Sequence, residues 1–231
     1  MKRIFEKHET LFCILLIVLY VIINSYCIQN FGMISYKSML INIIFSIFLV
    51  ILMMKINRVA YYGLTKIKEP KKYLYFIPLV IISTVNIWNG FNVNNSIKDI
   101  IFNIITMMNV GFIEEIIFRG FLFKMMEKEN PQKAITVSAI TFGIGHIVNL
   151  LNGADIIPTI IQICYAISLG YLFVIIFYKS KSLVPCIITH AVINSLAIFN
   201  VENTISLYIY SLILIVISLG YAIYINKTIK E

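Results

Sequence analysis

The chain consists of long apolar runs separated by short polar segments. Each run has roughly 16–25 residues, the length at which a helix rising 1.5 Å per residue crosses about 30 Å of hydrocarbon. We therefore predict an all-α, polytopic membrane protein. Its eight spans are expected near residues 10–28, 39–54, 73–91, 98–123, 133–151, 156–178, 182–199 and 204–225.

Composition supports the membrane location of the predicted spans, and the placement of charges predicts their orientation. The chain is 60% hydrophobic and 13% charged, with a mean hydropathy of +0.90, which excludes an ordinary soluble domain. If the N-terminus is cytoplasmic, 16 of the 19 Lys and Arg residues lie on the cytoplasmic side; Lys37 and Lys98 lie outside, and Arg119 lies within a span. The positive-inside rule thus predicts that both termini are cytoplasmic. The net charge of +8 suits anionic lipids, so we expect no nucleic-acid partner.

The chain shows no internal division. Residues 1–231 contain no linker, low-complexity tract or repeat, so we expect a single membrane domain whose motif-bearing core covers about 98–199. The first apolar run is too long for the apolar region of a signal peptide and lacks a small-residue cleavage site. The four cysteines form no C-x-x-C pair, and we interpret them as buried apolar groups rather than disulfides or ligands.

Ionisable residues occur inside the predicted spans. Adjacent Glu114 and Glu115 precede Arg119 in one apolar stretch. Such groups cost at least a few kcal/mol at membrane depth, so they are rare unless they are paired or functional. Glu115 and Arg119 are four residues apart and share a helix face, which predicts an ion pair. Glu114 is rotated by about 100° from Glu115 and has no partner on its own helix.

Two histidines also lie inside apolar segments. Phe142 is one turn before His146, and the glycines between and beside them allow another helix or a substrate to come close. His190 and Asn194 are four residues apart, so the ring and the amide are expected to project together.

Depth suggests that these groups meet. Counted along each helix from the nearest cytoplasmic lysine, Glu114, His146 and His190 lie roughly 14–20 Å into the membrane. We expect one cavity that opens towards the cytoplasm. A carboxylate and an imidazole at one point favour hydrolysis by an activated water.

The motifs resemble a known family. Glu-Glu-x-x-x-Arg, Phe-x-x-x-His and His-x-x-x-Asn, in this order on separate predicted helices, are similar to the motifs of the CPBP family, also called Abi. Its members are CAAX prenyl-proteases and bacteriocin-processing intramembrane endopeptidases. The resemblance runs from Gly111 to about Asn194 and includes Phe118-Arg119-Gly120 and Leu183-Val184-Pro185. It implies that the protein hydrolyses a peptide bond within the membrane.

The resemblance also implies roles for the motif residues. Glu114 and His146 would activate the attacking water, and His190 and Asn194 would stabilise the oxyanion. Structural support would come from Glu115, Arg119 and Phe142.

Metal dependence stays open at this point. Glu114, His146 and His190 are enough for a zinc site with an open position. A metal-free mechanism gives the same residues equally good roles, so the expected cofactor is either none or zinc.

The resemblance implies a peptide or membrane-protein substrate, with a role in peptide or bacteriocin maturation, self-immunity or surface processing. The abundance of Ile, Lys and Asn is typical of an AT-rich bacterial coding sequence, so we expect a bacterial cell membrane. Two alternatives stay open. One is a polytopic transporter or proton relay, although the two halves show no inverted repeat of broken helices. The other is a catalytically idle immunity protein. The oligomeric state is not predicted.

Overall fold

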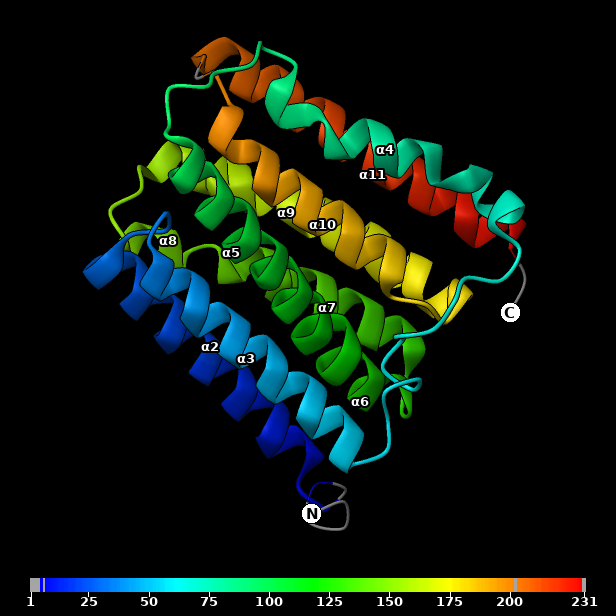
Figure 1. Ribbon diagram of the computed structural model, residues 1–231. Coiled ribbons are helices and arrows are strands. Elements are labelled where there is room, and N and C mark those ends of the chain that lie inside the picture. The colour runs from blue at the N-terminus through cyan, green and yellow to red at the C-terminus, as the bar shows by residue number, and fades with distance from the viewer. Residues whose placement is uncertain (1–4, 6, 202, 230–231) are drawn as a thin grey trace.

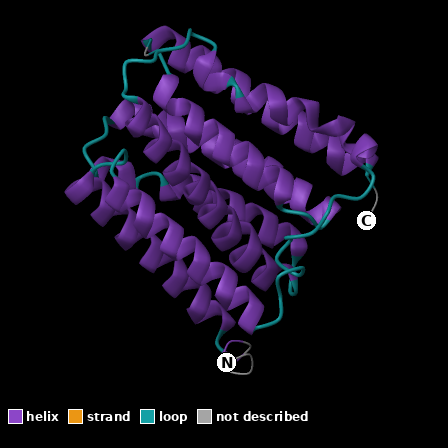
Figure 2. Cartoon of the chain, viewed as in Figure 1, coloured by secondary structure: helices purple, strands orange, loops and turns teal. Residues whose placement is uncertain are grey.

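Helices make up most of the chain, as Figure 2 shows. The computed structural model describes residue 5, residues 7–201 and residues 203–229, and these residues contain no strand. The all-α prediction is confirmed for this part of the protein.

Long apolar helices show that this is an integral, multi-pass membrane protein. Apolar side chains such as Ile22, Ile44 and Leu212 are exposed on their outer faces, where a membrane protein meets lipid. In the described residues, six helical stretches are long and apolar enough to cross a membrane: α2 (Glu9–Phe31), α3 (Tyr36–Lys55), α5 to α6 (Ile97–Glu127), α7 to α8 (Pro131–Leu151), α9 (Ile156–Ser180) and α11 (Thr204–Thr228).

Shorter helices occupy the other two predicted spans. Residues 182–199 form α10 (Val184–Leu196) and a short 3₁₀ turn, η4 (Ala197–Phe199). Residues 73–91 are broken into several pieces, because Leu74, Tyr75 and Phe76 have left-handed backbone conformations. These pieces are η1 (Pro70–Phe76), α4 (Ile77–Ser83) and η2 (Val85–Ile87). The eight-span count and the single domain therefore stay predictions.

Close helix contacts bring the motif-bearing helices together. α5 (Ile97–Glu115) packs against α3 and α10, while α9 packs against α7 (Pro131–Gly145) and α11 (Figure 1). A Cβ added to Gly111 of α5 would lie 2.8 Å from the backbone nitrogen of Ala191 on α10. A Cβ on Gly143 of α7 would lie 2.8 Å from the backbone nitrogen of Ile167 on α9. Glycine at these positions therefore lets α10 and α7 approach their neighbours next to the motif residues.

One end of the bundle is rich in basic residues. α2 begins and α11 ends there, beside the turn between α6 (Lys124–Glu127) and α7 (Figure 1). Glu9 pairs with Lys128 and, at 3.6 Å, with Arg58. We call this the basic end. The start of α2 and the end of α11 both lie on it, as the predicted orientation requires, and its location in the cytoplasm stays a prediction.

Candidate active site

The helix that carries the two glutamates changes geometry directly after them. The side chain of Ser96 caps α5 by accepting a hydrogen bond from the backbone N–H of Asp99. After Glu115 the chain continues as a π-helix, η3 (Ile116–Phe123), and all eight of its residues are buried. π-helical turns inside α-helices are frequent at functional sites.

Glu115 and Arg119 form the predicted ion pair. The Arg119 guanidinium donates to Glu115 Oε1 at 3.0 Å, and both side chains are fully buried. The guanidinium also lies over the ring of Phe142, 4.0 Å from its centroid, and 5.7 Å from the centroid of Phe173. These aromatic faces stabilise a cation that is shielded from water. Gly170 leaves room for the guanidinium, because a Cβ there would lie 3.1 Å from Nη2.

His190 connects this pair to the second glutamate. Its Nδ1 lies 2.9 Å from Glu115 Oε1, and its Nε2 lies 3.4 Å from Glu114 Oε2. The Nδ1 contact is within hydrogen-bond distance, and the Nε2 contact is a longer approach to the second carboxylate. The ring thus holds the two adjacent glutamates in a fixed relation, although they belong to different faces of α5.

Glu114 takes its shortest hydrogen bond from a helix that the motifs do not include. The Tyr20 hydroxyl on α2 donates to Glu114 Oε1 at 2.6 Å. Sequence reasoning missed Tyr20, because its position relative to Glu114 is set by tertiary packing. The one available signal was a phenol within an apolar run, since a buried tyrosine hydroxyl usually finds a partner.

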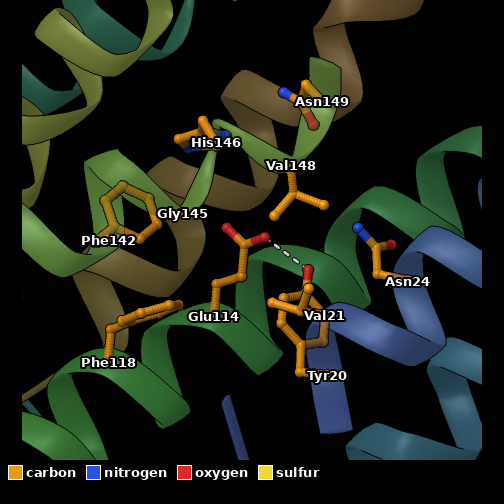
Figure 3. Close-up of a pocket in the computed structure, with 10 residues that line it drawn as sticks. All are labelled: Tyr20, Val21, Asn24, Glu114, Phe118, Phe142, Gly145, His146, Val148 and Asn149. Atoms are coloured by element: carbon orange, nitrogen blue, oxygen red, sulfur yellow. Dashed lines mark hydrogen bonds between the residues drawn. The ribbon is translucent and has the colours of Figure 1, made fainter. Parts of the chain in front are cut away.

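Glu114 and His146 face one small cavity, shown in Figure 3. Its volume of about 60 Å³ holds a few water molecules. The cavity is lined by Tyr20, Val21, Asn24, Glu114, Phe118, Phe142, Gly145, His146, Val148 and Asn149.

The cavity extends in a direction that the sequence did not predict. The sequence predicts an opening towards the cytoplasm. The lining residues instead continue past His146 to Val148 and Asn149 of α8 (Val148–Leu151), away from the basic end. The residues of η3 that follow Glu115 are buried, and the ring centroids of Phe121 and Tyr62 are 4.4 Å apart.

The Phe142 ring contacts both histidines of the site. Its ring lies edge-on to His146 and His190, at centroid distances of 5.4 and 5.6 Å. Asn194 is partly buried one turn after His190 and does not line the cavity. The structure therefore brings together six of the seven predicted site residues and leaves Asn194 at the side.

The side chains do not match a three-ligand metal site as they lie. Among the described residues there is no group of three His, Cys, Asp or Glu side chains arranged to hold a metal ion. His190 Nε2 and Glu114 Oε2 lie 3.4 Å apart, but among the described residues no third His, Cys, Asp or Glu side chain completes a metal-holding group with them as they lie. We derive no step through a metal.

Comparison with known proteins agrees with this geometry. Residues 96–196 match the family model of type II CAAX prenyl endopeptidase Rce1-like proteins. The match covers α5 to α10, and it confirms the resemblance seen in the motifs. It implies a CAAX-type intramembrane protease. Comparisons with curated proteins and with solved structures gave no match.

Proposed function

We propose that this protein is an intramembrane endopeptidase that hydrolyses a peptide bond with a water activated by Glu114 and His146. The observation that carries the proposal is that a carboxylate and an imidazole from different helices face one water-sized cavity among apolar membrane helices. The similarity of residues 96–196 to CAAX endopeptidases supports this chemistry.

The proposed reaction needs no group beyond the side chains and water. Glu114 takes a proton from the water, and the remaining hydroxide attacks the carbonyl carbon of the peptide bond. His146, which lines the same cavity, orients the water and shares in the proton transfer. The C–N bond then breaks, and the proton held by Glu114 passes to the leaving nitrogen.

Stabilisation of the oxyanion is assigned to His190 and Asn194. His190 Nε2 lies beside Glu114 Oε2 and would turn from it to the oxyanion when substrate is bound, and the amide of Asn194 on the same helix is a hydrogen-bond donor. Asn194 must turn towards the carbonyl when substrate is bound, since it does not line the cavity.

We further propose a bacterial cell membrane as the location and a peptide or membrane protein as the substrate, with a role in peptide or bacteriocin maturation, self-immunity or surface processing. Apolar outer faces on the six long helices support a membrane location.

The proposal is tested with purified protein in liposomes and a fluorogenic prenylated CAAX peptide. Wild type and Glu129→Gln, which changes an exposed glutamate, should both release fluorescence. Glu114→Gln and His146→Ala should lose at least about 10²–10⁴-fold in rate. Full activity in Glu114→Gln, or no cleavage by wild type, would overturn the proposal for this substrate.

A further inference from the structure

We infer that Tyr20 is a positioning residue for Glu114, supplied by a helix outside the segment that matches the family model. The inference rests on the proposed function, because it assigns Tyr20 a role through the proposed general base. It goes beyond the motifs, since α2 carries none of them and the family match begins at residue 96.

The geometry of the Tyr20 hydrogen bond is that of a strong interaction. Its length of 2.6 Å falls within the range of about 2.5–2.7 Å that is typical of a hydroxyl donating to an ionised carboxylate. Tyr20 is 5% exposed, so water competes little for either partner. A bond of this kind fixes the direction of one carboxylate oxygen.

The ring of Tyr20 is itself held in place. It stacks on Phe45 of α3, with centroids 6.1 Å apart and an angle of 21° between the ring planes. α2 is also held near both of its ends. Glu9 pairs with Lys128 at the basic end, and Gln29 donates to the side chain of Asn152 at the other end, at 3.1 Å. The hydroxyl is therefore presented to Glu114 by a fixed helix.

Glu114 needs such a partner, because its own helix provides none. With Oε1 bound to Tyr20, Oε2 is the oxygen that faces His190. A carboxylate held by two groups from other helices has one orientation at the cavity, and it does not have to be reoriented when the water is deprotonated. Loss of the phenol hydroxyl should slow the chemical step and leave substrate affinity nearly unchanged.

The test compares Tyr20→Phe with Tyr26→Phe, which removes a hydroxyl from an exposed position on the same helix. We expect kcat of Tyr20→Phe to fall about 10–100-fold with KM within about 2-fold, because the interaction acts on the base rather than on bound substrate. Tyr26→Phe should match wild type, and both variants should melt at nearly the same temperature.

A double-mutant cycle with Glu114→Gln separates the inference from the proposed function. If Tyr20 acts through Glu114, adding Tyr20→Phe to Glu114→Gln should lower the residual rate little further. An inactive Glu114→Gln beside a Tyr20→Phe with wild-type kcat would overturn the role of Tyr20 alone. An equal effect of Tyr20→Phe with and without Glu114 would also overturn it. A fully active Glu114→Gln would overturn the proposed function.

Discussion

Two adjacent residues, Glu114 and Glu115, occupy opposite environments. Glu115 is fully buried and shares one oxygen between Arg119 and His190. Glu114 keeps 12% of its side chain exposed, faces the cavity, and takes its partners from α2 and α10. Consecutive helix positions differ by about 100° of rotation. Glu115 therefore points into the protein, where it contacts Arg119 and His190, and Glu114 points to the cavity, where water can reach it.

The buried pair is not saturated with hydrogen bonds. Glu115 Oε2 and the Nε and Nη2 atoms of Arg119 are buried without a hydrogen-bond partner. Burying two charges costs several kcal/mol each, so such a pair adds little net stability even though removal of one partner is costly. We infer that Glu115 and Arg119 serve to fix the position of His190 and of the start of η3.

The largest expected effect is on catalysis at Glu114. Glu114→Gln keeps the shape of the side chain and removes the proposed base, so kcat should fall by about 10²–10⁴-fold or more while the membrane level stays normal. Single-turnover cleavage and thermal unfolding of the purified variant measure both quantities. A large drop in melting temperature would show that Glu114, like Glu115, is needed for stability, and the two glutamates would then not differ in role.

The next largest effect is on stability at Glu115 and Arg119. Glu115→Ala leaves the Arg119 charge buried and unpaired, which should cost about 3–5 kcal/mol and lower the folded yield. Glu115→Gln combined with Arg119→Gln removes both charges and should recover part of that loss. Yields and melting curves of the single and double variants are to be compared. If each single variant melts like wild type, the ion pair between Glu115 and Arg119 does not contribute to stability as expected.

Two glycines of α7 also differ in their surroundings, and the expected effects of changing them are smaller. A Cβ at Gly143 would lie 2.3 Å from the Ile167 side chain, whereas a Cβ at Gly145 would meet nothing within 4 Å, and Gly145 lines the cavity. Gly143→Ala should therefore cost about 1–3 kcal/mol through overpacking. Gly145→Ala should leave the melting temperature close to that of wild type. Equal melting temperatures for the two variants would show that α7 adjusts to the added methyl group.

The features that sequence predicted well depend on local rules. Apolar runs of sufficient length gave the positions of the six long helices, because the bilayer sets that length. The Glu115–Arg119 pair followed from the spacing of four residues, and it persists although the helix widens into η3. The proximity of Glu114, His146 and His190 followed from depth along each helix.

The features that sequence missed depend on packing between distant segments. Nothing in the first apolar run shows that Tyr20 lies beside Glu114, because 94 residues separate them. The breaks in residues 73–91 follow from left-handed backbone at Leu74–Phe76, and an apolar count does not detect this.

Chelation should have the smallest effect, and it tests how the two glutamates share His190. In the structure, one ring nitrogen of His190 faces Glu115 and the other faces Glu114. A zinc ion bound by Glu114, His146 and His190 would require the three side chains to move together, because they do not form a metal-holding group as they lie. A good site also needs partners that hold each ring. We therefore expect protein purified without added metal to keep its activity and melting temperature after treatment with a tight chelator. Stoichiometric zinc in elemental analysis, lost together with activity and restored by zinc alone, would contradict this expectation. Glu114, His146 and His190 would then have to close around the metal while Glu115 continued to hold Nδ1 of His190.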